Sequence, residues 1–125
     1  MDPIKVIIVD DSDFVRDGMR IILEIDDDFE VVGCASNGKE AVELARLNKC
    51  DVVLMDIQMP VMDGYTATRE IRQLADKELA DIPIIAMTAN VFDEDKTKAA
   101  EAGMNGHLGK PIDIGALVTV LRKYR

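Results

Sequence analysis

Four short apolar runs, separated by amphipathic stretches, constrain the fold of this chain more than any other feature. The runs are Val6–Val9, Val52–Met55, Ile84–Met87 and, more weakly, Gly106–Leu108. Near-continuous Val, Ile and Leu stretches of this length are typical of parallel strands that are buried on both faces. Because such strands alternate here with helical patterns, right-handed crossovers and a parallel sheet covered by helices are expected.

The predicted elements alternate strictly between strand and helix. Two apolar stripes at helical spacing mark the first two helices: Phe14, Val15, Met19, Ile22 and Leu23, then Ala41, Val42, Leu44, Ala45 and Leu47. Strands are predicted at 4–9, 30–35, 51–55, 83–87 and 106–108, and helices at 13–25, 38–47, 65–75, 92–102 and 113–123. The predicted fold is therefore a single doubly wound α/β domain over residues 1–125.

Local signals support several of these boundaries. Ser12 can cap the helix at 13–25, and Asn37, with Glu40 three residues later, can begin the next helix. Gly103 is expected to end a helix in a left-handed conformation.

The charge balance excludes several classes of function. Fifteen basic against 24 acidic residues give a net charge of −9, which argues against direct binding to nucleic acid or to an anionic membrane. No apolar run approaches a membrane span and no signal peptide is recognisable, so a cytoplasmic protein is expected. Cys34 and Cys50 lack metal-ligand spacing and are predicted to be free thiols.

Five polar residues follow the apolar runs. Asp10 and Asp11 follow the first run, and the later runs are followed by Asp56, Thr88 and Lys110. The carboxyl ends of parallel strands form one edge of an open sheet, where ligands bind. Each residue taken singly has an ordinary explanation as a solvated loop or cap residue. Their shared placement instead predicts that three carboxylates, a hydroxyl and an ammonium meet in one pocket.

These side chains suit phosphoryl transfer. Three carboxylates form a hard-oxygen site for Mg²⁺, and without the cation they repel one another and should destabilise the fold. An aspartate such as Asp56 can attack phosphorus and carry an acyl phosphate. Lys110 supplies a charge for the phosphoryl oxygens, and Thr88 supplies a movable donor. The predicted chemistry is positioning and charge neutralisation with Mg²⁺ as a clamp.

The chain resembles the receiver domains of two-component response regulators, which share the fold of the chemotaxis response regulator. The matching segments are Val9–Asp11, Leu54–Gly64, Met87–Asn90 and Gly103–Pro111. The resemblance implies a flavodoxin-like, five-stranded sheet of order 2-1-3-4-5. Residues up to Ile71 resemble receivers attached to DNA-binding regulators, whereas Thr88–Lys123 resembles receivers of hybrid sensor kinases.

The resemblance also implies the ligands of the site. Asp56 would accept a phosphoryl group from a phosphohistidine on a sensor histidine kinase or a histidine phosphotransfer protein. Mg²⁺ would be held by Asp11, Asp56 and the backbone carbonyl of Gln58, with Asp10 holding a metal-bound water. Lys110 would contact the phosphoryl oxygens, and its peptide bond to Pro111 would be cis.

A switch is implied as well. Thr88 would turn inward to bond the phosphate, and the face formed by 91–102, 106–108 and 114–123 would change and meet an effector domain or target protein. Family members usually carry Tyr or Phe three residues before the lysine, where this chain has His107. Two interpretations stay open: a smaller ring with the same role, or a pH-sensitive switch. Gln58 and Asn90 would tune the lifetime of the acyl phosphate.

Three other functions fit the sequence less well. A small Mg²⁺-dependent aspartate-nucleophile phosphohydrolase normally needs an acid two residues after the nucleophile, where this chain has Gln58, and it needs a cap over the substrate. A flavodoxin-like electron carrier is disfavoured because Asp10 and Asp11 would repel the phosphate of its cofactor. A phosphorylation-independent docking module would not need all five polar residues. The expected protein is a signalling receiver that catalyses only its own phosphorylation and dephosphorylation.

Overall fold

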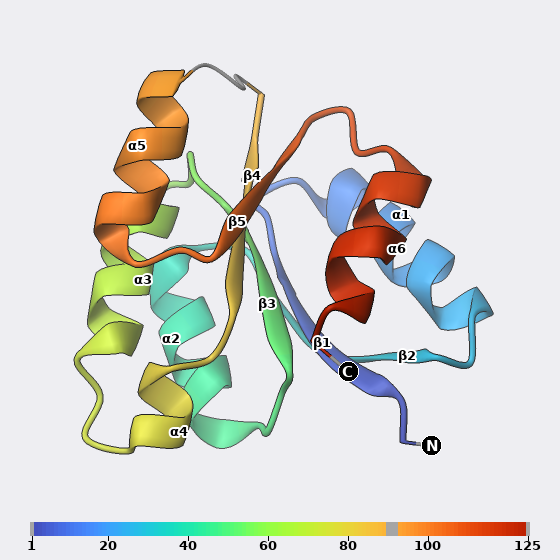
Figure 1. Cartoon of the computed structure of the whole chain (residues 1–125), viewed down its shortest axis with the longest axis horizontal. Coiled ribbons are helices and arrows are strands. Elements are labelled where there is room, and N and C mark those ends of the chain that lie inside the picture. The colour runs from blue at the N-terminus through green and yellow to red at the C-terminus, as the bar shows by residue number, and fades with distance from the viewer. Residues whose placement is uncertain (1, 90–92, 125) are drawn as a thin grey trace.

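Five parallel strands form the single sheet of the protein, seen in a computed structural model that describes residues 2–89 and 93–124 (Figure 1). The strands are β1 (Ile4–Val9), β2 (Phe29–Ala35), β3 (Val52–Asp56), β4 (Ile84–Thr88) and β5 (Gly106–Gly109). Their order is β2-β1-β3-β4-β5, and all four pairings are parallel. This confirms the doubly wound, flavodoxin-like topology.

Helices cover both faces of the sheet (Figure 1). In the described part of the chain they are α1 (Asp13–Ile25), α2 (Gly38–Leu47), α3 (Gly64–Arg72), α4 (Lys77–Ala80), α5 (Asp93–Ala102) and α6 (Ile114–Arg122). Helices α1 and α6 pack on one face, and α2, α3 and α5 pack on the other. The helix predicted at 92–102 is therefore α5, because the short α4 precedes it.

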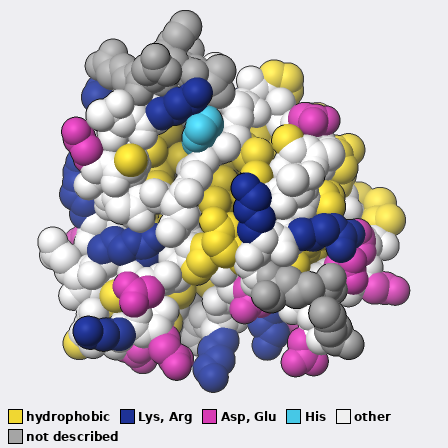
Figure 2. Space-filling view, in the orientation of Figure 1, with side chains coloured by type: hydrophobic (Ala, Val, Ile, Leu, Met, Phe, Trp, Pro, Cys, Tyr) yellow, Lys and Arg dark blue, Asp and Glu magenta, His cyan; other side chains and the backbone are white. Residues whose placement is uncertain are grey.

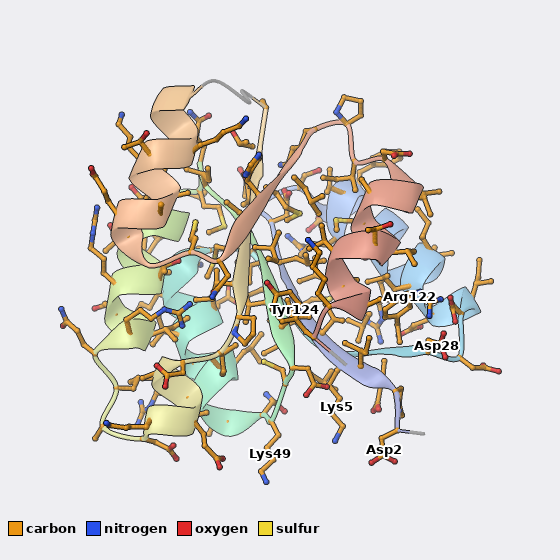
Figure 3. All side chains as sticks on the ribbon, in the orientation of Figure 1. Asp2, Lys5, Asp28, Lys49, Arg122 and Tyr124 are labelled. Carbon is orange, nitrogen blue, oxygen red and sulfur yellow. The ribbon has the colours of Figure 1, made fainter. Side chains whose placement is uncertain are left out.

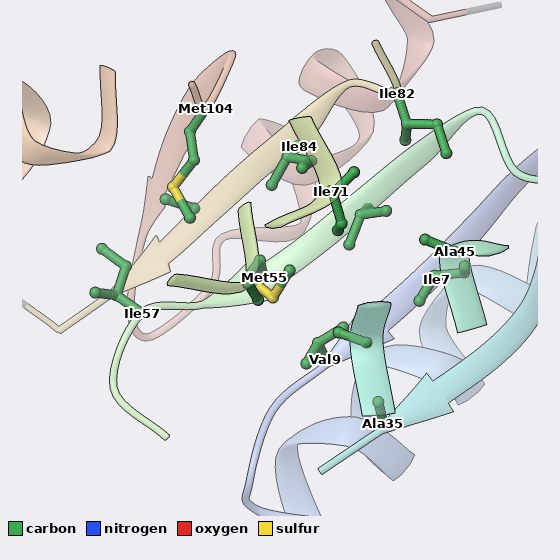
Figure 4. Packing of buried hydrophobic residues seen from close by; sticks show 14 of the residues in the cluster. Ile7, Val9, Ala35, Ala45, Met55, Ile57, Ile71, Ile82, Ile84 and Met104 are labelled. Carbon is green, nitrogen blue, oxygen red and sulfur yellow. The ribbon is translucent and has the colours of Figure 1, made fainter. Parts of the chain in front are cut away.

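The two faces of the sheet carry separate cores. Alternate strand residues point to opposite sides: Ile7 and Met55 pack toward α2 and α3, whereas Ile8 and Leu54 pack toward α1 and α6. Figure 4 shows part of the first cluster, in which Met55 lies close to Ile71 of α3. Burial on both sides explains why these strands are continuous apolar runs rather than alternating ones.

Some predicted details were wrong. Helix α4 was not predicted, because its four residues are too few to show a helical period. Its cap is Asp76, which accepts a hydrogen bond from the backbone of Glu78. Phe14 and Leu47, counted in the predicted apolar stripes, are 88% and 77% exposed. Hydrophobic side chains accordingly reach the surface on the side of α1 (Figure 2).

The predicted caps and thiols are confirmed. The Ser12 side chain accepts from Val15 N at 3.3 Å, and that of Asn37 accepts from Glu40 N at 3.0 Å. Gly103 has a φ of 103° at the end of α5. Cys34 and Cys50 are free and half-buried. None of the described helices is both long enough and apolar enough to cross a membrane.

Arg72, the last residue of α3, joins three segments that follow it. Its guanidinium donates to the carbonyl oxygens of Ala80 and Ile82 at 2.7 Å each, and twice to that of Gly103 at 2.8 and 3.0 Å. It also donates to Asn105 Oδ1 at 2.8 Å. Burial lowers the pKa of Arg72. This side chain therefore holds the ends of α3, α4 and α5 together.

A second arginine makes side-chain contacts at the amino edge of the sheet. Arg122, at the end of α6, donates to Asp28 Oδ2 at 2.7 Å and lies over the ring of Phe29 at 5.6 Å from its centroid (Figure 3). Lys5 and Lys49 project from the same edge (Figure 3). The polar residues singled out by the sequence lie at the opposite, carboxyl edge.

Candidate functional site

The register of the sheet brings the predicted polar residues together. Val9 pairs with Met55, so Asp10 and Asp56 are the next residues along neighbouring strands. Thr88 pairs with Gly109, so Lys110 follows directly beside it. Asp56 and Thr88 are the last residues of β3 and β4 rather than the first residues of the loops. A cleft of about 270 Å³ at this edge is lined by Asp11, Asp56, Ile57, Gln58, Met87, Thr88, Ala89 and Lys110.

Asp10 lies behind this cleft and is fully buried, at 0% exposure. Its Oδ1 accepts from Ser12 N at 2.9 Å, and its Oδ2 accepts from Lys110 Nζ at 2.7 Å. Its backbone N–H donates to Ala35 O at 3.1 Å. A buried carboxylate is tolerable only when it is paired and hydrogen-bonded in this way.

Lys110 bridges two carboxylates. Its Nζ lies 2.7 Å from Asp10 Oδ2 and 3.4 Å from Asp56 Oδ1. Burial lowers the pKa of Lys110, but its hydrogen bond to Asp10 and the charges of Asp56 and Asp10 outweigh that effect, so the net pKa is raised. The backbone N–H of Lys110 donates to Thr88 O at 2.8 Å, and the Lys110–Pro111 peptide bond is cis, which confirms the prediction.

Asp56 is only 6% exposed, and its pKa is raised to about 6. The main cause is burial, and the neighbouring charge of Asp10 acts in the same direction. Lys110 and a hydrogen bond from the Gln58 backbone lower the pKa of this carboxyl but do not compensate. In the metal-free protein, burial and the charge of Asp10 therefore outweigh the contacts that favour the ionised form of Asp56.

Three carboxylates converge at the cleft. One oxygen from each of Asp10, Asp11 and Asp56 lies within 4.8 Å of the others. Asp10 and Asp56 are buried, whereas Asp11 is exposed, so the cluster is reached from solvent on the side of Asp11. Oxygen donors of this kind fit a hard divalent cation that keeps several of its waters. The three carboxylates are therefore a candidate site for such a cation.

The loop after Asp56 folds back so that the backbone of Gly64 lies against the backbone of Asp56 and Ile57. Gly64 N donates to Ile57 O at 2.9 Å, and a Cβ at Gly64 would lie 2.4 Å from the carbonyl oxygen of Asp56. Asp63 caps α3 by accepting from Thr66 N at 2.8 Å. The Asp63–Gly64 pair therefore caps α3 and brings its first residue against the backbone of Asp56.

The predicted switch residues lie at different depths. Thr88 is 8% exposed and lines the cleft together with Gln58. His107 is exposed on β5, beside Ala86, and the only histidine of the chain is visible at the surface in Figure 2. Asn90 and the beginning of the predicted output face, Val91 and Phe92, lie outside the described residues.

Arg16 contacts the backbone of Asp10 but was not singled out from the sequence. Its Nη1 donates to the backbone oxygen of Asp10 at 2.5 Å, and its Nη2 contacts the Asp13 carboxylate. A signal was available, because a cation in the first turn of a helix is disfavoured by the helix dipole unless an acceptor lies nearby.

Comparison with known proteins gives a consistent result. Residues 6–122 match the family model of the response regulator receiver domain. The response regulator UvrY of Escherichia coli K12 is 40% identical over 119 residues, which is 95% of this chain and 53% of UvrY. The transcriptional regulatory protein YdfI of Bacillus subtilis is 41% identical over 106 residues, which is 85% of this chain and 47% of YdfI. The chain thus spans about half the length of these relatives.

Solved structures share the fold over nearly the whole chain. The receiver domain of the sensor histidine kinase PA1611 from Pseudomonas aeruginosa, crystallised with a magnesium ion in its active-site cleft, superposes with a TM-score of 0.85 at 34% identity and covers 98% of this chain and 97% of its own. The chemotaxis protein CheY4 of Vibrio cholerae gives a TM-score of 0.88 at 29% identity, with 98% and 99% covered.

Proposed function

The chain belongs to the response regulator receiver domain family, and on that basis we propose that Asp56 accepts a phosphoryl group in a two-component phosphorelay. The donor is a phosphohistidine on a sensor histidine kinase or a histidine phosphotransfer protein. The observation that carries this proposal is the convergence of Lys110 and three carboxylates, that of Asp56 among them, at one cleft. We propose that residues 1–125 form one receiver unit.

The reaction is a transfer between two nucleophiles. A carboxylate oxygen of Asp56 forms a bond to the donor phosphorus, while the bond from phosphorus to the imidazole nitrogen breaks and its electron pair stays on the nitrogen. The ammonium of Lys110, 3.4 Å from Asp56 Oδ1, is close enough to follow the incoming phosphoryl oxygens. Attack of water on the acyl phosphate later releases inorganic phosphate and restores the Asp56 carboxylate. The chain catalyses only these two reactions, its own phosphorylation and its own dephosphorylation.

Mg²⁺ is the proposed cofactor. Asp11, Asp56 and the Gln58 backbone carbonyl would hold it, with Asp10 holding a metal-bound water. The carboxylate cluster supports this assignment, as does the magnesium ion in the cleft of the PA1611 receiver. When bound, the cation neutralises charge on the phosphoryl oxygens. Cation binding would also hold Asp56 in the ionised form that attacks phosphorus.

Phosphorylation then acts as a switch. The phosphoryl group adds a charge of about −1.5 to −2 inside the cleft. Thr88 turns toward it and draws the loop after β4 inward, and His107 on the neighbouring strand responds. The surface of α5, β5 and α6 changes and meets an effector domain or target protein. Gln58 and Asn90 set the lifetime of the acyl phosphate.

Intact-mass measurement after incubation with acetyl phosphate tests the proposal. One phosphate adduct is expected in the presence of Mg²⁺, none in its absence, and none in Asp56→Asn. Asp17→Asn, a change of the same charge on the exposed side of α1, should be phosphorylated like the wild type. Failure of the folded wild-type protein to form the adduct would overturn the proposal. Turnover of a generic phosphomonoester would instead favour the phosphohydrolase.

A further inference from the structure

Arg16 is buried more deeply than its place in the first turn of α1 requires. Its side chain is 16% exposed, whereas that of Arg20, one turn later, is 55% exposed. Arg20 pairs with Glu24 on the helix surface, as a solvated arginine commonly does. Arg16 instead turns back toward the end of β1, where Nη1 reaches the Asp10 carbonyl oxygen at 2.5 Å.

The guanidinium holds both ends of the turn between β1 and α1. Nη1 binds the Asp10 carbonyl, and Nη2 binds the carboxylate of Asp13, the first residue of the helix. A planar guanidinium offers two donors in fixed geometry, which a single ammonium cannot do. Because Asp13 is 86% exposed, its ion pair is expected to contribute little, and the bond to the carbonyl is the better shielded of the two.

The Asp10 carbonyl belongs to the peptide that carries Asp11. The other polar atoms of Asp10 are held by Ala35, Ser12 and Lys110. Once the carbonyl is also held, the plane of the peptide between Asp10 and Asp11 is fixed. The orientation of that plane determines where the exposed Asp11 carboxylate stands relative to Asp56.

We propose that Arg16 is a positioning residue for the cation and phosphoryl site. It acts on the main chain: by holding the Asp10 carbonyl, it keeps the carboxylates of Asp10 and Asp11 converged on Asp56. This role rests on the proposed function where it is tested by phosphorylation. The test by Mg²⁺ binding is independent of whether Asp56 accepts a phosphoryl group.

Four variants separate this role from a simple effect of charge. Arg16→Gln removes the guanidinium. Arg16→Lys keeps the positive charge but loses the pair of N–H donors in fixed positions. Arg20→Gln removes an equal charge from the same helix at a site away from Asp10. Asp13→Asn weakens only the exposed ion pair. Each is compared with the wild type by circular dichroism and then titrated with Mg²⁺ while backbone amide resonances are followed by NMR.

The Mg²⁺ dissociation constant of Arg16→Gln is expected to rise about tenfold, the loss typical of residues that orient metal ligands. Arg16→Lys should show a smaller rise, and Arg20→Gln and Asp13→Asn should stay within twofold of the wild type. With acetyl phosphate, Arg16→Gln should need about tenfold more Mg²⁺ for half-maximal phosphorylation. At saturating Mg²⁺ its rate should return toward that of the wild type.

Equal Mg²⁺ affinities in Arg16→Gln and Arg20→Gln, whether both unchanged or both weakened, would overturn the role of Arg16. If Arg16→Gln does not fold, Arg16→Lys decides, and a wild-type Mg²⁺ affinity in that variant overturns the proposal. Absence of Mg²⁺ binding or phosphorylation in the wild type would count against the proposed function instead.

Discussion

The ammonium of Lys110 lies closer to Asp10 than to Asp56, at 2.7 Å from Asp10 Oδ2 and 3.4 Å from Asp56 Oδ1. Asp10 is the more deeply buried of the two carboxylates and takes the shorter bond. Asp56 consequently keeps a raised pKa of about 6 although a cation lies beside it. The lysine thus compensates the aspartate that cannot reach solvent and leaves Asp56 only partly compensated.

Replacement of Lys110 is expected to destabilise the metal-free protein. Lys110→Met leaves the Asp10 carboxylate buried without its cation, which should lower the free energy of unfolding by about 3 kcal/mol at pH 7. Urea denaturation measures the change. Lys49→Met, the same loss of charge at the opposite edge of the sheet (Figure 3), should change stability by less than about 0.5 kcal/mol. Equal effects in the two variants would contradict the prediction.

The pKa of Asp56 predicts a pH-dependent stability. Because its folded pKa of about 6 lies above the ordinary value of 3.8, the folded state binds more protons than the unfolded state between these values. Its contribution to stability therefore falls as pH rises from about 4 to about 6. Asp56→Asn should be about 2 kcal/mol more stable than the wild type at pH 7, and nearly equal to it at pH 4.

Urea denaturation of both proteins across this pH range, without divalent cations, measures that difference. Asp17→Asn, on the surface of α1, is the matched control and should follow the wild type at each pH. A stability difference between Asp56→Asn and the wild type that does not change with pH would show that burial does not raise the pKa of Asp56.

Repulsion within the carboxylate cluster should be relieved by removing Asp11. Without divalent cations, Asp11→Asn is expected to melt roughly 3 °C higher than the wild type, since the oxygens of Asp10 and Asp56 lose a charged neighbour. With saturating Mg²⁺ the order should reverse, because the variant lacks a proposed ligand of the cation. Thermal melts of both proteins with and without Mg²⁺ test the two expected differences in melting temperature. A metal-free midpoint at or below that of the wild type would rule the repulsion out.

Gly64 and Gly18 provide a matched pair of glycine substitutions. A Cβ at Gly64 would lie 2.4 Å from Asp56 O and 3.0 Å from the Ile57 Cα, both main-chain atoms that cannot move aside cheaply. Gly64→Ala should therefore cost about 2–3 kcal/mol and slow phosphorylation of Asp56. At Gly18, within α1, a Cβ meets nothing within 4 Å. Gly18→Ala should instead stabilise the protein by about 0.5–1 kcal/mol.

Much of the fold was predictable because its signals are local. Helices α1 and α2 begin and end at the predicted residues, since Ser12 and Asn37 are side-chain caps that a sequence displays directly. The order of the strands came from the family resemblance, because apolar runs do not state which strand lies beside which. The four-residue α4 was missed because its sequence contains no repeat of the helical period.

The site, like the fold, was predictable in part. The polar residues of the site were placed at one edge because each follows an apolar run, and parallel strands end at the same edge of a sheet. They are Asp10, Asp11, Asp56, Thr88 and Lys110. Arg16 and Arg72 were not predicted, because most of their partners are backbone carbonyls. Every residue has such an oxygen, so the residue types in the sequence do not identify the acceptor; only the place of Arg16 in the first turn of α1 was a signal.

Asp10 and Lys110 are 100 positions apart in the sequence, and this separation has a consequence for folding. During synthesis the three carboxylates are all present once residue 56 has been made, but the cation that pairs with Asp10 follows 54 positions later, on the loop after the edge strand β5. Until that strand docks, the acidic cluster opposes compaction of the strands that carry it. Docking of β5 is therefore the step at which the nascent chain gains both its last sheet partner and its internal counter-ion.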